Sequence, residues 1–328
     1  MTDKSINYRF RIVGPSGVLP ALRKHCACIL LSATLVFFAG PAAAGKFADN
    51  MAHYSAAKTY AEQLRYLDAA LEGWTYGDGQ LGKADAHLRR GNIRYTLKQA
   101  GGAVADFTAA LELAPDQVGI CLNRGNAYKL SGDYKAATSD YSKLLKHDQF
   151  RAMGLTGMGD VFLLTKNFAK AEEYYEAARR ANPSEHTPVF NMAVLYYLQG
   201  KYEKAKTLAR KASDMDVSGN FRFYALVISG YSNFCLDRHK SALRDFNASL
   251  KLKPDYLYAV IGAGLAHSVM AETEKASARL RQAEKLDPRL KDGVKTLELD
   301  FKAQEFRFLN DKVRKEFDTM SLLLHYGK

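Results

Sequence analysis

The sequence contains little proline and little cysteine. Only 8 of its 328 residues are proline, and this scarcity favours a mostly helical chain because proline interrupts helices. Of the four cysteines, only Cys121 and Cys235 follow residue 44. Hydrophobic residues make up 47% of the chain and charged residues 25%, a balance typical of a folded protein rather than a disordered one. We therefore predict a folded and largely helical protein.

Motifs that carry chemistry are also scarce. No two histidines are spaced i, i+4, and the chain lacks the Cys-x-x-Cys and G-x-S-x-G motifs of metal sites and hydrolases. Residues 77–83 begin like a phosphate-binding loop, but Ala84 stands where Ser or Thr should reach magnesium, so we interpret them as a linker. Gly262 and Gly264 lack the third glycine of a dinucleotide motif. We predict that the protein is not an enzyme and holds no cofactor and no metal.

The N-terminal region has the pattern of a targeting segment. Five basic residues, among them Arg9, Arg11, Arg23 and Lys24, precede the apolar run at 26–40, and three alanines, Ala42 to Ala44, follow it. A basic region, a short apolar region and small residues describe an export signal cleaved after Ala44. We expect residues 1–44 to be a signal peptide of an exported, periplasmic protein, and an uncleaved membrane anchor is the alternative.

The chain is basic with or without this segment. Its net charge is +12 at pH 7, and removing the five Lys/Arg and one Asp of residues 1–44 leaves 42 basic and 34 acidic residues, a net charge of +8. A basic chain favours an acidic partner or surface. The charge does not by itself imply nucleic acid, and we predict neither a nucleic acid nor a small-molecule substrate.

A repeat of 34 residues organises the rest of the chain. Small residues recur at position 8 of each unit, and alanine recurs twelve positions later in all six units. The position-8 residues are Gly91, Gly125, Gly159, Ala193, Gly230 and Gly264, with three extra residues around Ser218. An aromatic or apolar residue follows the alanine by four, as Tyr141 does in the second unit, and we expect it to fill the space beside the small residues.

This pattern resembles the tetratricopeptide repeat (TPR), a helix–turn–helix unit of the same period, over residues 84–290. The departures are Ala193 for glycine, and Gln149 and Val217 for the unit-ending proline. The resemblance implies an all-α, right-handed superhelical solenoid of six units with capping helices at both ends. The expected organisation is a capping helix and linker at 45–83, units at 84–117, 118–151, 152–185, 186–222, 223–256 and 257–290, and a helical segment at 291–328. Because three units separate Cys121 from Cys235, we expect two buried thiols rather than a disulfide.

The resemblance also implies a concave groove lined by positions 2, 5, 9, 12 and 13 of each first helix. The predicted partner-binding residues are Asn92, Tyr95, Asn126, Lys129, Phe190, Tyr197, Tyr224, Tyr231, Phe234 and Tyr258. In chaperone-binding members, asparagines at such positions help to clamp a carboxylate, but Leu88, Met153 and Gly157 replace the cations that this clamp needs. The asparagines can still hold the backbone of an extended peptide. The aromatic face either anchors a partner or is partly covered by the phenylalanine-rich segment 291–328.

We therefore predict a non-enzymatic scaffold that offers its groove to a peptide or helix of a protein partner, in cell-envelope or secretion-related assembly. The alternative is a membrane-anchored regulatory or structural subunit of a larger enzyme complex. A transferase or hydrolase assembled from separated repeats is the third hypothesis.

Overall fold

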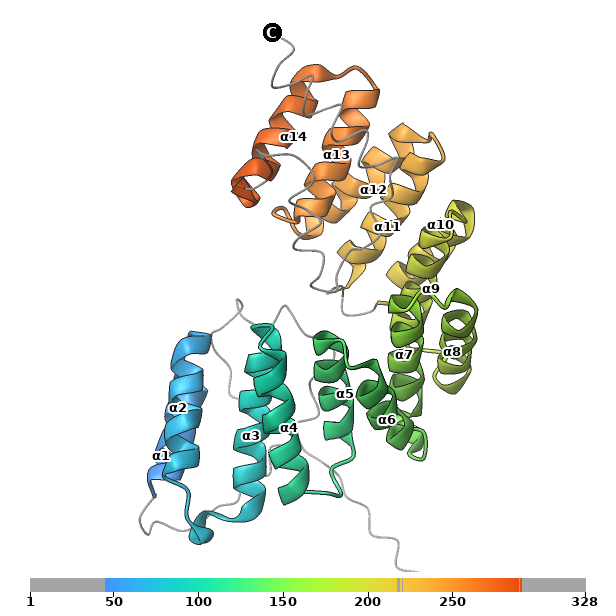
Figure 1. Ribbon diagram of the computed structural model, residues 1–328. Helices are drawn as coiled ribbons and strands as arrows, with labels where there is room; N and C mark the ends of the chain where they lie inside the picture. The colour runs from blue at the N-terminus through green and yellow to red at the C-terminus, as the bar shows by residue number, and fades with distance from the viewer. Residues whose placement is uncertain (1–44, 217–218, 220, 289, 291–328) are drawn as a thin grey trace, which may run out of the picture. The chain divides into compact units, whose positions relative to one another are not determined.

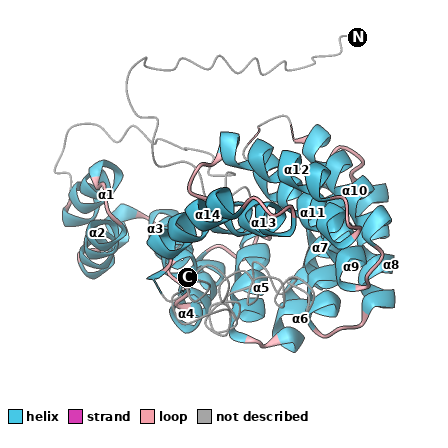
Figure 2. Cartoon of the chain, turned by 90° about the horizontal axis from the view of Figure 1, so that it is seen from above, coloured by secondary structure: helices cyan, strands magenta, loops and turns pink. Residues whose placement is uncertain are grey.

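The computed structural model of the protein describes residues 45–216, 219, 221–288 and 290, which form fourteen α-helices, one 3-10 helix and no strand (Figures 1 and 2). The helices are α1 (Lys46–Ala56), α2 (Tyr60–Glu72), η1 (Tyr76–Asp78), α3 (Gln80–Thr96), α4 (Ala100–Leu113), α5 (Gly119–Ser131), α6 (Tyr134–Leu144), α7 (Asp148–Leu164), α8 (Phe168–Ala181), α9 (His186–Leu198), α10 (Tyr202–Met215), α11 (Arg222–Cys235), α12 (His239–Leu252), α13 (Leu257–Val269) and α14 (Thr273–Leu286). The predicted signal peptide and the segment 291–328 lie outside the described residues.

Helices α3 to α14 form the six predicted units. We call the first helix of each unit an A helix (α3, α5, α7, α9, α11 and α13) and the second a B helix (α4, α6, α8, α10, α12 and α14). Each A helix packs on the B helix of its own unit, and each from α5 onward also packs on the B helix of the unit before it. Successive B helices begin 34 residues apart, except that 37 residues separate the starts of α10 and α12. The helices thus follow the 34-residue spacing of the sequence, with three extra residues between α10 and α12.

The turn between the A and B helices has one conformation in all six units. Repeat position 15 adopts a positive φ, with Gly132 at 84° and Gly200 at 73°, as the two predicted turns require. The other four units place Lys98, Lys166, Asp237 and Ala271 there, at φ between 58° and 61°. Side chains with a Cβ are strained in this region, so these four turns are held by the packing of the flanking helices.

Tyr141 shows how the units interlock. A Cβ added to Gly125, in the same unit, would lie 2.7 Å from its ring, and a Cβ added to Gly157, in the next unit, would lie equally close. The ring is fully buried between the two glycines. Gly230 and Gly262 approach Phe246 in the same way. The position-8 glycines therefore pack as predicted, and Gly157 and Gly262 at position 6 prove to be packing residues as well.

The region before the first unit differs from the prediction of one helix and a linker. Helices α1 and α2 pack against each other, and α2 packs against α3. A capping box between Thr59 and Glu62 starts α2. The predicted linker at 77–83 is part of η1 and of the first turn of α3, which begins four residues before the first repeat unit. Phe47, Leu67 and Ile93 form a small core between this helical hairpin and the first unit.

Candidate partner-binding surface

A row of polar side chains runs along the A helices of the first four units. The amide of Asn123 donates to Asn92 Oδ1 across 3.4 Å, from α5 to α3. The hydroxyl of Tyr141 donates to Asn126 Oδ1 across 2.8 Å. In both Asn92 and Asn126 the oxygen is therefore engaged, while the amide N–H groups can donate to a ligand. Both residues are part-exposed, as the prediction of a surface role requires, and Tyr95 is part-exposed beside them.

Lys129 occupies this row but does not present a free charge. Its Nζ lies 2.6 Å from Asp160 Oδ2 on α7, and its side chain is only 12% exposed. Asp160 Oδ1 also accepts from Tyr175 at 2.9 Å and from Asn191, on α9, at 2.7 Å. Burial would lower the pKa of Lys129, but the charge of Asp160 outweighs burial and raises it. Asp160 thus joins three units, a role that the sequence analysis did not identify.

Three of the ten predicted groove residues are not exposed. Tyr197, Tyr231 and Phe234 are fully buried, so the prediction that they form an exposed aromatic face is wrong. The hydroxyl of Tyr197 lies 3.7 Å from Cys235 Sγ, and the hydroxyl of Tyr231 donates to the carbonyl oxygen of Tyr258 at 2.9 Å. Burial raises the pKa of both tyrosines. Large side chains at these positions pack the units together.

Three other predicted aromatic residues, Phe190, Tyr224 and Tyr258, gather around two residues that the sequence analysis missed. Phe221 lies 4.6 Å from Phe190 and 5.4 Å from Tyr224 between ring centroids. Tyr256 lies 5.3 Å from Tyr224 and 5.7 Å from Tyr258. We call these five residues the aromatic cluster. Phe190, Phe221, Tyr224 and Tyr258 are part-exposed and Tyr256 is buried. Phe221 follows the three extra residues of the fourth unit. This insertion is the sequence feature that could have pointed to Phe221.

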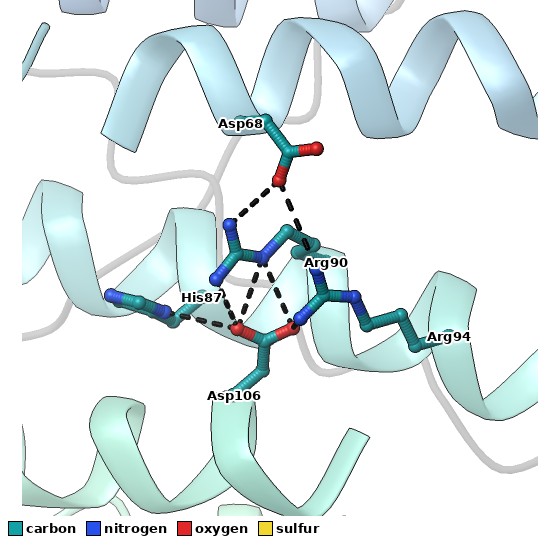
Figure 3. Close-up of polar contacts among 5 residues, drawn as sticks. All are labelled: Asp68, His87, Arg90, Arg94 and Asp106. Carbon is teal, nitrogen blue, oxygen red and sulfur yellow. Dashed lines mark hydrogen bonds and ion pairs between the residues drawn. The ribbon is translucent and has the colours of Figure 1, made fainter. Parts of the chain in front are cut away.

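Away from the polar row, a buried carboxylate connects the first unit to the preceding hairpin (Figure 3). Asp106 on α4 is 2% exposed, and its oxygens lie 2.6 Å from Arg90 Nη2 and 2.8 Å from Arg94 Nη1. His87 Nδ1 lies 3.2 Å away. The second nitrogen of Arg90, Nη1, reaches Asp68 on α2 at 2.7 Å. Arg90 therefore ties α2, α3 and α4 together.

Related carboxylates occupy the same repeat position in the second and fifth units. Asp140 accepts from Arg124 Nε at 2.7 Å and from Lys143 at 2.8 Å. Asp245 accepts from Ser229 at 2.7 Å and lies 3.3 Å from Arg210. Burial alone would raise the pKa of Asp106 and of Asp140, but their hydrogen bonds and cationic neighbours outweigh it and lower both pKa values. Every one of these carboxylates is satisfied within the fold, so we assign them to its stability.

The described residues contain neither a metal-binding cluster nor a membrane-spanning helix. No group of three or more His, Cys, Asp or Glu among them could hold a metal ion. No helix in residues 45–288 has the length and apolar character to cross a bilayer. Cys121 and Cys235 are both buried and no disulfide joins them to each other, as predicted.

Comparisons with known proteins agree with this architecture. Models of the family described as Tetratricopeptide repeat match residues 84–117 and 122–186. Protein CTR9 homolog of Arabidopsis thaliana is 24% identical over 217 residues, which are 63% of this chain and 20% of that protein. DnaJ homolog subfamily C member 3 of Bos taurus is 22% identical over 219 residues, 62% of this chain and 43% of that protein. The chain therefore spans less than half the length of these relatives.

Solved structures show the same fold. A tetratricopeptide repeat protein from Parabacteroides merdae superposes with a TM-score of 0.57 at 16% identity, over 84% of this chain and 99% of that chain. The Cut9–Hcn1 hetero-tetramer gives a TM-score of 0.57 at 13% identity, over 75% of this chain and 49% of that chain. The family models thus identify tetratricopeptide repeats at residues 84–117 and 122–186, and the helix pairs and these structures show the tetratricopeptide repeat fold.

Proposed function

We propose that the protein is a non-enzymatic scaffold that binds a peptide or helix of a protein partner along its A helices. The observation that carries this proposal is the aromatic cluster beside the polar row. Part-exposed tyrosine and phenylalanine rings are the side chains that dominate binding energy at protein interfaces. The amide donors of Asn92 and Asn126 are suited to the carbonyl oxygens of an extended peptide.

The pairing of Lys129 with Asp160 shapes what this surface can bind. Because the ammonium group is neutralised, the polar row offers no free cation at that point to a terminal carboxylate. Recognition then depends on backbone hydrogen bonds at α3 and α5 and on apolar contact at α9 and α11. We infer a ligand that enters as an extended chain and presents an apolar residue to the aromatic cluster.

We place this activity in the periplasm, in cell-envelope or secretion-related assembly. The support is the pattern of residues 1–44, which describes an export signal, and the alternative remains an uncleaved anchor that makes the chain a subunit of a membrane complex. Mass spectrometry of the N-terminus of the protein expressed in a Gram-negative host separates the two. A mature chain beginning at Gly45 supports export with cleavage, and retention of residue 1 supports the anchor.

Site-specific photocrosslinking tests the binding surface. A photoreactive phenylalanine analogue is placed at Phe190 or Tyr258 of the full chain, and at Tyr76 as the control. Tyr76 is an aromatic residue that is 85% exposed in η1, outside the A helices. We expect the same partner to crosslink from Phe190 and Tyr258 and not from Tyr76.

A substitution then measures the contribution of the cluster to binding of that partner. We expect Tyr224→Ala to weaken binding about tenfold or more, as loss of an interface aromatic residue does, while Tyr76→Ala leaves it unchanged. Crosslinks of equal yield from all three sites, or equal affinity of the two alanine variants, would show that the partner does not use the aromatic cluster.

A further inference from the structure

The B helices carry a charge difference that the proposed function does not use. Helices α4, α6 and α8 together have five Lys/Arg and six Asp/Glu. Helices α10, α12 and α14 together have eleven Lys/Arg and five Asp/Glu. The net charge therefore changes from −1 on the first three B helices to +6 on the last three.

Side-chain contacts join the last three B helices into one layer. Arg238, at the start of α12, lies 2.5 Å from Glu203 on α10, and Arg210 on α10 lies 3.3 Å from Asp245 on α12. Arg279 on α14 donates to Asn247 on α12 at 3.4 Å. We call α10, α12 and α14 the basic B layer.

Two of the five acidic residues of this layer, Glu203 and Asp245, form ion pairs with its own cations, while Asp214 and Glu274 are exposed. Glu203 pairs with both Lys206 and Arg238, and Asp245 is buried and accepts from Ser229 and Asn233. Seven exposed cations form no ion pair with any described residue: Lys204, Lys211, Lys240, Arg244, Lys251, Arg281 and Lys285. Their charge is available to an anionic partner.

The side chains between these cations favour a lipid surface over a protein or a nucleic acid. Leu252 and Leu286, 44% and 39% exposed, occupy the same repeat position at the ends of α12 and α14, each directly after a lysine. The layer presents little aromatic surface, because Phe246 is buried and the part-exposed Tyr202 packs against Tyr197 at 5.5 Å. Protein hot spots and single-stranded nucleic acids both depend on exposed aromatic rings. Lysines beside exposed leucines are typical of attachment to an anionic bilayer.

We propose that the basic B layer of the last three units docks the protein on an anionic membrane surface, leaving the A helices to hold the protein partner. Each cation near such a surface contributes independently to binding, and salt screens the attraction. This inference goes beyond the scaffold function and does not depend on it, because the two surfaces lie on different helices.

Vesicle sedimentation of the full chain tests the proposal. The probes are vesicles of phosphatidylcholine alone and vesicles with about 30% phosphatidylglycerol, in about 50 mM salt, and the quantity compared is the ratio of the two partition coefficients. This ratio removes any contribution of residues 1–44 to neutral vesicles. The test variant is Lys240→Glu with Arg244→Glu on α12. The control is Lys135→Glu with Lys170→Glu on α6 and α8, which makes the same charge change at exposed sites.

We expect the α12 variant to lower the ratio by about 30-fold or more, because each cation near an anionic surface contributes roughly a factor of five. The control should lower it far less, and about 500 mM salt should abolish the preference for anionic vesicles. Tyr224→Ala should leave the ratio unchanged, which separates this test from that of the scaffold. Equal loss in both double variants would overturn the proposal, since only the total charge would then matter. Binding to polyglutamate without binding to anionic vesicles would overturn it in favour of an acidic protein.

Discussion

The first two units and the next two differ in the residues that pair at two positions of the repeat. The pair is ionic in the first two units and apolar in the next two. At repeat positions 7 and 23, the first unit pairs Arg90 with Asp106 and the second pairs Arg124 with Asp140. The third and fourth units place Met158 with Tyr174, and Met192 with Leu208, in their apolar cores. The interface between an A helix and its B helix therefore accepts either a buried ion pair or an apolar pair without a change of repeat length.

This difference concerns how much a buried ion pair contributes to the stability of a unit. Removing two charges from water costs several kcal/mol, and the attraction between them often only offsets this desolvation cost. An apolar pair of similar size has no such cost. The ion pairs of the first two units are therefore expected to make those units sensitive to substitution and to acid, rather than more stable than their neighbours.

The largest expected effect is that of Asp106→Ala. This change leaves Arg90 and Arg94 without their buried partner, so we expect the free energy of unfolding of the first unit to fall by about 3–5 kcal/mol. Urea unfolding and hydrogen exchange of α3 and α4 measure it. Asp68→Ala is the control, because Asp68 is 47% exposed and its loss should cost about 1 kcal/mol or less. Equal losses in the two variants would show that burial does not decide the effect.

The second-largest effect is expected when the ion pair of the second unit is replaced by the apolar Met–Leu pair of the fourth unit. Arg124→Met alone leaves Asp140 buried beside Lys143 only, and should cost about 2–3 kcal/mol. Adding Asp140→Leu removes the unpaired charge, so the double variant should recover most of this loss. A double-mutant cycle by urea unfolding gives the coupling energy. If the losses of the two single variants add in the double variant, the second and fourth units differ in more than this pair.

Acid should destabilise the first two units before it destabilises the third and fourth. The folded-state pKa values of Asp106 and Asp140 are lowered from 3.8, so their stabilising contribution is complete above that pH and is lost as pH falls from 3.8 through the folded values. Glu203 in the fourth unit also has a lowered pKa, caused by Lys206 and Arg238, but its side chain is 53% exposed and solvent screening reduces its contribution. Hydrogen exchange below about pH 4 should therefore increase in α3 to α6 before α7 to α10. Simultaneous loss of protection in all eight helices would contradict this.

The repeat pattern predicted most of the fold because it records local packing. The position-8 glycines, the buried ring of Tyr141 and the turn at Gly132 each follow from residues within one unit or its neighbour. Such contacts recur every 34 residues, so six copies confirm one another. The hairpin of α1 and α2 has no copy in the chain, and its second helix was missed for that reason.

The candidate site was harder to predict because it depends on contacts between units. Lys129 lies at a surface position of its own helix, but Asp160 of the next unit neutralises it. Tyr197 and Tyr231 occupy positions assigned to a groove, yet neighbouring helices bury their rings. Phe221 belongs to a lengthened turn outside the repeat pattern, although it connects Phe190 to Tyr224. A repeat frame shows which helix face a residue occupies, but it does not show what the next unit places against it.

The smallest expected effect concerns the turn that all six units share. Ala271 adopts a φ of 59° where the second and fourth units use glycine. Because an alanine in this region is strained by roughly 1 kcal/mol, Ala271→Gly should raise the free energy of unfolding of the sixth unit by about 0.5–1 kcal/mol. Gly200→Ala in the fourth unit is the reciprocal change and should lower stability by a similar amount. Thermal unfolding of both variants measures the pair, and shifts of the same sign would show that helix packing, rather than the turn conformation, decides the outcome.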